Sequence, residues 1–582
     1  MCPDDLPGDS DDLVIRARPA HRIPVVAHLL AGRTAAPAVS VLRCTAAALV
    51  ALLVFLGVAE LVAVPVGPAA APTLAIGEVA IAHTPNSVKD FAIAHFGEHD
   101  KAVLVIGIYL VLALVAVAVG AATGTLRSRP PAFAALAVLG AVAALSAATR
   151  LTGGPLDAMP SMAGAAAAAA AFALLTPRWP AGSASAADGD TSERPGDTSR
   201  RPGAGAGAGV AASPAGVPPA GGSGTRPALS RRRFLTSGAA LAGMGTAALV
   251  AGRSALQSAA DAVSSRAAVR LPRPALRGRV VAGTDVGVAG VPPYITPNAD
   301  FYRVDTALVV PKLRTEGYTL RLHGLVDRPV TWTYQELLRM PLAEQTMTLV
   351  CVSDPVGGPY LGNARWLGVP LGPLLRDSGV HPAANQLFMT SADGMTIGAD
   401  LRAAMDGRPA LLAVGMNGEP LPFEHGFPLR AVIPGFYGYA SACKWLVDLE
   451  VTTYGAKQAY WVQRGYAQRA PIKLESRIDT PASFAQLRRG PVIVAGSAWL
   501  PGVGIRDVQV AVDGGPWQDA ALAAVDSVDT WRQWRWRWSA TPGSHSIAVR
   551  AVDARGRIQT AGRAGVFPDG ASGHQSVVVT VA

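Results

Sequence analysis

Long apolar stretches dominate the first third of the chain, where hydrophobic side chains run on with few charges between them. Each is close to the length that crosses a lipid bilayer as a helix. The sequence therefore predicts four transmembrane helices in a membrane region covering residues 41–176. The stretches are Val41–Val66, Ala102–Gly124, Pro131–Ala148 and Met159–Thr176. The fourth is rich in alanine and only weakly hydrophobic, so a soluble helix packed on the other three is the alternative.

Charges at the ends of these stretches predict their orientation. Five arginines precede the first stretch in the N-terminal arm, residues 1–40, and at its edge, whereas acidic residues outnumber lysines in the loop that follows. Arg127 and Arg129 lie between the second and third stretches. Because basic residues favour the cytoplasmic side, the N-terminus is expected inside, and four spans return the chain to the cytoplasm.

Residues 177–230 lose all apolar periodicity and consist largely of Gly, Ala, Pro, Ser and Asp, which predicts a flexible cytoplasmic linker. The linker leads into Arg231-Arg232-Arg233-Phe234-Leu235 and a mildly apolar run to Val250. This segment resembles a twin-arginine export signal joined to a fifth transmembrane helix over 231–255. An ordinary helix with basic flanks is the alternative, and both place the later residues outside the cytoplasm.

The pattern of apolar runs and turn residues in the remaining sequence predicts two folded domains. Residues 275–472 alternate short apolar runs with Pro/Gly turns and a few helical patches such as Tyr334–Arg339, which predicts an α+β domain. Residues 476–582 carry strand signals at short intervals, as in an all-β sandwich. In the tryptophan-rich strand, Trp534, Trp536 and Trp538 alternate with arginines and share one face. A buried core or a dimer interface is expected for them, with a carbohydrate-binding face as the alternative.

Composition narrows the chemistry. No two of the four cysteines form a C-x-x-C pair, so the sequence predicts neither an iron–sulfur cluster nor a structural zinc site. The net charge of +10 comes largely from the arginine-rich flanks of the apolar stretches, and no nucleic-acid-binding motif is present. The predicted spans contain no histidine, so a bis-histidine haem inside the membrane is not supported. Glu60 is a candidate proton or quinone contact, with snorkelling to the interface as the alternative.

Cys351 stands between a strand-like run and a glycine-rich turn, where a single thiolate could complete the coordination of a cofactor-borne metal. Further motifs follow in order: Ala364-Arg365-Trp366-Leu367-Gly368-Val369-Pro370, Met416-Asn417-Gly418-Glu419-Pro420, His425-Gly426-Phe427-Pro428-Leu429-Arg430 and Lys444-Trp445. Together with Leu349-Val350-Cys351-Val352-Ser353 they resemble the sulfite oxidase family of molybdopterin enzymes. The ordered set is far more specific than any one member.

The resemblance implies a Mo-molybdopterin cofactor and a role for each matching residue. Cys351 would ligate molybdenum, and His425 and Arg430 would hold the pterin. A guanidinium can grip a phosphate bidentately, and an imidazole can give one directional hydrogen bond. Tyr466 would be an active-site tyrosine near the metal, or else a residue that caps the domain junction. The remaining implied cofactor contacts are Tyr302, Arg303, Asp393, Ala442, Cys443 and Lys444.

The sequence departs from the sulfite-oxidising pattern at the substrate site. Val304, Asp305 and Thr306 stand where an arginine, an asparagine and a histidine are expected, and Asp354 and Pro355 replace further arginines. A carboxylate in place of cations repels a dianion. We therefore doubt sulfite as the substrate and expect a neutral or cationic oxo compound such as a sulfoxide or N-oxide.

The leading hypothesis is thus a multi-pass membrane protein with an extracytoplasmic molybdenum oxidoreductase domain that moves an oxygen atom to or from a small molecule. The electron partner would be a quinone or a redox protein. The C-terminal sandwich resembles the family's immunoglobulin-like dimerisation domain, which implies a homodimer. The alternatives are a non-catalytic extracellular binding module, or a membrane transporter or sensor regulated by the exported domain.

Overall fold

The computed structural model describes residues 27–85, 88, 91–92, 95–96, 99–150, 153–176, 230–257, 260–278 and 280–582. Most of the predicted N-terminal arm and the linker up to residue 229 therefore lie outside the described residues. The chain forms two compact units, which are treated separately below. One contains the described parts of Met1–Val58, Leu110–Gly140 and Ala163–Ala248, and the other contains those of Ala59–Tyr109, Ala141–Met162 and Leu249–Ala582.

The N-terminal region is helical, as predicted. Its elements are α1 (Ala27–Val66), η1 (Pro68–Ala70), α2 (Pro72–His83), α4 (Asp100–Leu126), α5 (Pro130–Ala148), η3 (Pro155–Ala158), α6 (Met159–Leu175), α7 (Arg231–Gln257) and α8 (Ala260–Ala268). Five stretches are long and apolar enough to cross a membrane: Ala38–Val66, Asp100–Leu126, Pro130–Ala148, Pro155–Leu175 and Arg231–Ser254. They coincide with the five predicted spans to within a few residues, which is compatible with a membrane anchor.

Glu60 does not snorkel toward an interface. It is 1% exposed, and its Oε1 lies 3.5 Å from Nε of Arg253 on α7. Thr73 also donates a hydrogen bond to this oxygen over 3.5 Å. The carboxylate is therefore buried against a cation from a different apolar helix, because an unpaired charge among these helices would be far more costly.

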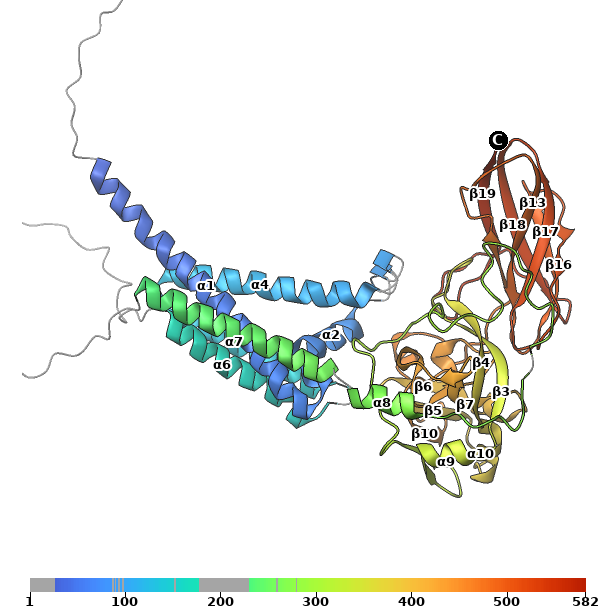
Figure 1. Cartoon of the computed structure of the whole chain (residues 1–582), viewed down its shortest axis with the longest axis horizontal. Helices are drawn as coiled ribbons and strands as arrows, with labels where there is room; N and C mark the ends of the chain where they lie inside the picture. Colours follow the sequence, from blue (N-terminus) through green and yellow to red (C-terminus); the bar gives the residue numbers. More distant parts are fainter. Residues whose placement is uncertain are drawn as a thin grey trace, which may run out of the picture. The chain divides into compact units, whose positions relative to one another are not determined.

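Residues 319–452 form a sheet-rich domain with two sheets (Figure 1). The first has the order β2-β1-β10-β5-β6 and is antiparallel except for the parallel β1–β10 pair. Its strands are β1 (Thr319–Gly324), β2 (Val330–Thr333), β5 (Gln386–Ser391), β6 (Thr396–Asp400) and β10 (Leu446–Thr452). The second follows the path β3-β4-β7-β8, with β9 on β7. Its strands are β3 (Ala343–Val350), β4 (Leu361–Pro370), β7 (Leu411–Met416), β8 (Glu419–Pro420) and β9 (Arg430–Val432).

Short helices connect these strands and begin at recognisable signals. They are α9 (Tyr334–Arg339), α10 (Leu371–Asp377) and α11 (Leu401–Met405). Thr333 and Glu336 cap α9 reciprocally, because the Thr333 hydroxyl accepts from the Glu336 amide and the Glu336 carboxylate accepts from the Thr333 amide. Every residue of β7 is buried; Leu412 and Val414 join the main core, and Leu411, Ala413 and Met416 join a second apolar cluster. The domain thus holds its site loops on a continuous apolar core.

The C-terminal region consists of two further sheets with a shared core (Figure 1). One has the order β11-β13-β17-β16 and the other β12-β19-β18-β14-β15. Trp534 and Trp538 are buried and Trp536 packs against the same core, whereas Arg535 and Arg537 are exposed. The packing agrees with the core interpretation of the tryptophans. The strands are β11 (Glu475–Thr480), β12 (Gln486–Leu487), β13 (Gly490–Trp499), β14 (Ile505–Val512), β15 (Gln518–Asp519), β16 (Ala521–Leu522), β17 (Arg532–Ala540), β18 (Gly543–Asp553) and β19 (Gln575–Val581).

Candidate active site

Cys351 begins the loop between β3 and β4, and that loop is held tightly. The Cys351 amide donates to the Tyr360 carbonyl over 2.9 Å, and the Ser353 amide points at the Cys351 sulfur over 3.4 Å. Asp354 closes the loop by accepting from the Tyr360 amide over 2.7 Å. Burial raises the pKa of the Cys351 thiol to about 11. A cation or a metal is therefore needed to keep this sulfur as a thiolate, and a metal ligand is deprotonated by the metal it binds.

His425 and Arg430 flank Gly426, where the chain passes very close to Lys444. His425 ends the short helix η4 (Phe423–His425), and Arg430 begins β9. Gly426 between them has φ +108°, and a Cβ there would lie 3.0 Å from the Cα of Lys444. Only glycine combines this backbone conformation with such a contact. The glycine therefore lets the His425 segment pass directly beside Lys444.

The side chains of His425 and Arg430 are both buried. Each has one polar atom that forms no hydrogen bond with any residue that the structure describes. His425 is 3% exposed and its Nε2 lies 3.2 Å from the Asn298 carbonyl. Burial, with Lys444 and Arg430 nearby, lowers the pKa of His425 to about 3, so the ring is neutral. A carbonyl only accepts, so Nε2 carries the proton and Nδ1 is a bare acceptor. Arg430 is 4% exposed and its Nε has no partner. Such orphaned atoms indicate a missing ligand.

A second group of charges surrounds Asp305. Lys101 donates to its Oδ1 over 2.5 Å, Lys444 to its Oδ2 over 3.0 Å, and Arg303 to its Oδ2 over 2.9 Å. Burial alone would raise the pKa of Asp305, but Lys444, Lys101 and Arg303 together hold it well below its usual range. Burial lowers the pKa of Lys444 to about 8, so the ammonium keeps its proton at neutral pH. The predicted carboxylate at position 305 is thus present but fully paired.

A cavity of 480 Å³ brings nine of the ten predicted site residues together. They are Cys351, Tyr466, Tyr302, Arg303, Asp393, Arg430, Ala442, Cys443 and Lys444. His425 lines an adjacent cavity of 470 Å³ together with Asn298, and Arg303 borders both. A ligand that runs between Arg430, Lys444 and His425 would therefore reach from the thiol of Cys351 into the second cavity.

Four further candidates occupy distinct places on the cavity wall. Asp393 lies in the turn between β5 and β6, where it accepts from the Met395 amide over 3.1 Å, and burial raises its pKa. Cys443 is fully buried in the main core. Tyr302 stacks on Phe301, with ring centroids 5.3 Å apart. Tyr466 packs edge-on against Tyr439, Trp461 and Phe567.

Sequence reasoning missed two kinds of site residue. Asn298 fixes His425 through a backbone carbonyl, which no side-chain motif signals. The cavity is also lined by residues from the segment that links α2 to the start of α4 in the same compact unit, among them Ile81, Val88, Lys101 and Leu104. They lie some two hundred positions before the other site residues and follow no recognisable motif.

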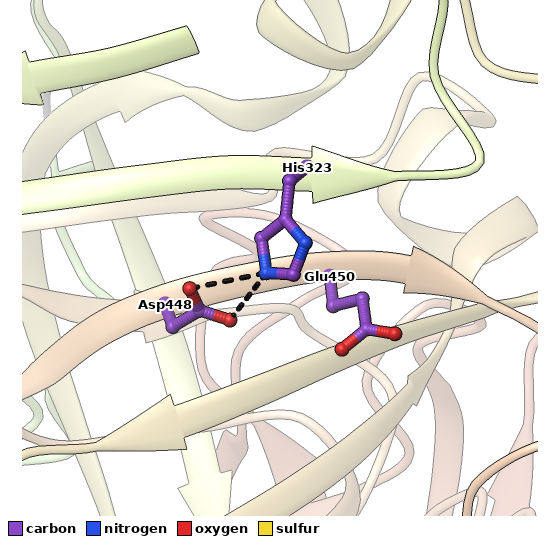
Figure 2. A group of neighbouring side chains, drawn as sticks. All are labelled: His323, Asp448 and Glu450. Carbon is purple, nitrogen blue, oxygen red and sulfur yellow. Dashed lines mark hydrogen bonds and ion pairs between the residues drawn. The ribbon is translucent and has the colours of Figure 1, made fainter. Parts of the chain in front are cut away.

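One group of side chains elsewhere has ligand types that suit a metal. His323 on β1 faces Asp448 and Glu450 on the neighbouring β10 (Figure 2). The imidazole Nε2 lies 2.9 Å from the nearer Asp448 oxygen, and Lys457 forms an ion pair with Glu450. The ammonium already neutralises one carboxylate, so we interpret the group as a surface charge network.

The main cavity suits an anionic, metal-carrying cofactor. It offers the Cys351 thiol as a soft ligand, the buried cation Arg430 with its unpaired Nε, and the partly buried cation Lys444, while the adjoining space holds the bare Nδ1 of His425. A dithiolene pterin with a phosphate needs such a set, since its phosphate requires cations and its ring requires directional hydrogen bonds. The residues present therefore fit the molybdopterin that the resemblance implies.

Comparisons with known proteins agree with a molybdopterin cofactor. The family model described as oxidoreductase molybdopterin binding domain matches residues 307–461. Rat mitochondrial sulfite oxidase is 31% identical over 317 residues, which are 46% of this chain and 57% of that protein. The inducible NADH nitrate reductase 2 of Glycine max is 30% identical over 309 residues, which are 42% of this chain and 34% of that protein.

The similarity extends to a bacterial relative. The uncharacterized oxidoreductase YuiH of Bacillus subtilis (strain 168) is 33% identical over 152 residues, which are 26% of this chain and 73% of that protein. The chain spans a little over half the length of the sulfite oxidases that it matches. The site geometry and these similarities agree on one conclusion: the chain belongs to the sulfite oxidase family of molybdopterin-binding oxidoreductases.

Proposed function

We propose that this enzyme is a membrane-anchored, extracytoplasmic molybdenum oxidoreductase that transfers an oxygen atom to or from a small, uncharged substrate. The observation that carries the proposal is the cavity that the Cys351 thiol lines together with two cations, the buried Arg430 and the partly buried Lys444. When bound, the molybdenum cofactor supplies two-electron oxygen-atom transfer. Everything else is the work of the protein's own side chains.

Each of these side chains has a task that its position supports. Cys351 is the proposed metal ligand, and the loop hydrogen bonds fix the direction of its sulfur. Arg430 and Lys444 hold the anionic part of the cofactor, and Nδ1 of His425 accepts one hydrogen bond from it. Tyr302, Arg303, Asp393, Ala442 and Cys443 complete the proposed cofactor wall. Tyr466 is placed to hold or give a proton at the substrate oxygen.

The lining of the cavity supports an uncharged substrate. Asp305 engages Lys101, Arg303 and Lys444, so each of these cations already has a partner, although one carboxylate does not neutralise all three. Asp100 and Asp393 add carboxyl groups to the wall, and Ile81, Val88 and Leu104 add apolar groups. In the reductive direction, a sulfoxide plus two electrons and two protons gives a thioether and water. A reduced quinone or a redox protein would supply the electrons.

The location is proposed from the helices and from the arginine pattern. Five apolar stretches suit a multi-pass anchor with its N-terminus in the cytoplasm, and the arginines at 231–233 suit export of the folded domain. Replacing Arg231 and Arg232 by lysine keeps the charge but removes the paired guanidinium groups. We expect residues 275–582 to stay protected from external protease in this variant. An ordinary transmembrane helix with basic flanks would still export them.

The C-terminal sandwich is proposed to be immunoglobulin-like and to mediate a homodimer. Its two sheets enclose one apolar core, as such a domain requires. Light scattering of the detergent-solubilised protein, with the mass of the bound detergent subtracted, tests the dimer. A mass equal to one chain contradicts it.

The activity is tested with the full-length protein in detergent and three probes: methyl phenyl sulfoxide, trimethylamine N-oxide and sulfite. Reduced benzyl viologen serves as donor for the first two, and ferricyanide as acceptor for the third. We expect turnover of an uncharged oxo compound and a loss of kcat of about a hundredfold in Tyr466→Phe. Tyr439→Phe is the matched control, since the Tyr439 hydroxyl lines the same cavity but already donates to the Ala467 carbonyl. Turnover of sulfite alone would contradict the substrate proposal.

A further inference from the structure

The outer wall of the catalytic cavity comes from a part of the chain that precedes the enzyme domain by about two hundred residues. Ile81 near the end of α2, Val88 in the connection, and Leu104 in the first turns of α4 line the same cavity as Cys351. All of them belong to the compact unit that contains the catalytic residues. The connection between two proposed membrane helices therefore contributes to the active site.

Two contacts hold this part of the chain, and both involve residues 305–308: the segment itself makes the first, and residues 63–77 just before it make the second. The first is polar: the Lys101 ammonium lies 2.5 Å from Oδ1 of Asp305, with side-chain exposures of 19% and 7%. Asp305 in turn binds Lys444, which is a proposed cofactor contact. Removing one partner of a well-shielded pair is costly, because it leaves the other charge buried and uncompensated.

The second contact is apolar. Leu308 packs against a small cluster formed by Ala63, Ala71 and Leu74. Gly77 on α2 lies so close that a Cβ there would come within 2.7 Å of the Leu308 Cδ1 atom. Leu308 therefore packs closely against the small residues of this cluster and against Gly77. The polar and the apolar contacts together determine where the segment lies.

The chemistry of this wall differs from that of the cofactor side. Ile81, Val88, Ala92 and Leu104 present apolar groups to the cavity. The described residues of the segment that line the cavity also include the polar Thr84, His99 and Asp100 and the cation Lys101, which is paired with Asp305. A dianion would therefore meet apolar side chains and the carboxyl group of Asp100 on this wall, whereas an uncharged molecule with an apolar group would bury that group there.

We propose that Ile81, Val88, Ala92 and Leu104 form the outer wall of the substrate pocket, that Lys101 positions this wall through Asp305, and that the wall selects uncharged substrates with an apolar substituent. The selection rests on the proposed oxygen-transfer function, but the position of the wall does not. Lys101 acts through Asp305 and is a positioning residue.

The position of the wall is tested by photo-crosslinking in the full-length protein. The probe p-benzoylphenylalanine replaces Val88, which lines the cavity, and in a control protein it replaces Leu114, an exposed residue further along α4. We expect the probe at 88 to label residues within 302–306 or 460–466, and the probe at 114 to label neither. Equal absence of labelling from both positions, in protein with full molybdenum content, would overturn the proposal.

The selection is tested by comparing methyl phenyl sulfoxide with dimethyl sulfoxide. Wild type should prefer the phenyl compound in kcat/KM, and Lys101→Met should lose about tenfold of that preference through KM, with kcat on dimethyl sulfoxide changed less. Lys101→Arg keeps the positive charge and should retain the preference for the phenyl compound. Lys457→Met removes a comparable ion pair on the surface and should leave the preference within about twofold of wild type.

The outcomes separate the two proposals. Crosslinking from position 88 together with the predicted loss in Lys101→Met supports both the wall and its selectivity. Crosslinking without any preference for the phenyl compound, or with turnover of sulfite alone, overturns the selectivity. Protein without molybdenum refutes the proposed function, and the crosslink still decides whether the wall is where we place it.

Discussion

Gly426 offers a sharp test of how the backbone builds the cofactor site, and we predict that Gly426→Ala costs both stability and cofactor. Its φ of +108° disfavours any side chain, at about 1–3 kcal/mol. The new Cβ would also lie 3.0 Å from the Cα and 3.1 Å from the Cβ of Lys444. Non-bonded carbon atoms normally lie at least about 3.5 Å apart, so the Lys444 segment must shift by a few tenths of an ångström.

Gly407→Ala is the matched control, because Gly407 in the same domain has φ +99° but no atom within 4 Å of the place that a Cβ would take. Both variants should therefore lose about the same 1–3 kcal/mol from backbone strain, which lowers the unfolding temperature by several degrees. Only Gly426→Ala should also lose molybdenum and pterin, since only it displaces Lys444.

The assay is thermal unfolding followed by tryptophan fluorescence, with elemental analysis of molybdenum on the same preparations. Equal cofactor content in the two variants, at equal loss of stability, would refute the reasoning. It would show that the close approach of the His425 segment to Lys444 does not matter for binding.

Three further predictions concern other parts of the molecule. Burial, followed by the charge of Asp354, raises the pKa of Glu475 to about 8, so the folded state holds a proton that the unfolded state releases above about pH 4.3. Stability should therefore fall as the pH rises from 5 to 8, and Glu475→Gln should flatten that fall in pH-dependent unfolding; an equally steep decline would contradict it. Trp534→Ala should cost the C-terminal region about 3–5 kcal/mol in denaturant unfolding, because Trp534 is fully buried, whereas Trp536→Ala should cost clearly less; the reverse order would refute this packing. Arg430→Met should strongly reduce the pterin content measured by cofactor fluorescence, because Arg430 is buried in the proposed cofactor site. Arg365→Met is the control, since Arg365 is more exposed and pairs with Glu344, and it should keep its pterin. Equal pterin content in the two variants would count against the role of Arg430.

The sequence predicts elements where one local signal decides the structure. Uninterrupted apolar runs located the proposed spans, so that the predicted Ala102–Gly124 differs from the observed Asp100–Leu126 by two residues at each end. The helical patch predicted at Tyr334–Arg339 is α9. The placement of Cys351 between a strand and a turn was likewise local, and it follows directly on β3.

Features that depend on distant partners could not be read in this way. Glu60 stood alone in its apolar stretch, and its partner Arg253 lies in another helix almost two hundred residues later. Asp305 suggested a repulsive charge, because nothing local shows that Lys101 and Lys444 would neutralise it. The outer wall of the cavity was missed for the same reason: Ile81, Val88 and Leu104 look like ordinary residues at the ends of apolar helices.

The central claim is that Cys351 holds the molybdenum of a family cofactor, and it is tested most directly by metal and pterin content. Full-length wild type, Cys351→Ser and Cys443→Ser would be produced in a cofactor-competent host and analysed side by side. Cys443 is the control, since it lines the same cavity and is buried even more fully, at 0% against 8% exposure, but is proposed as part of the cofactor wall and not as a metal ligand. We predict about one molybdenum per chain in wild type and Cys443→Ser, and altered metal spectra with loss of turnover in Cys351→Ser. Wild-type protein without molybdenum, or a Cys351→Ser variant with unchanged metal spectra, would contradict the account.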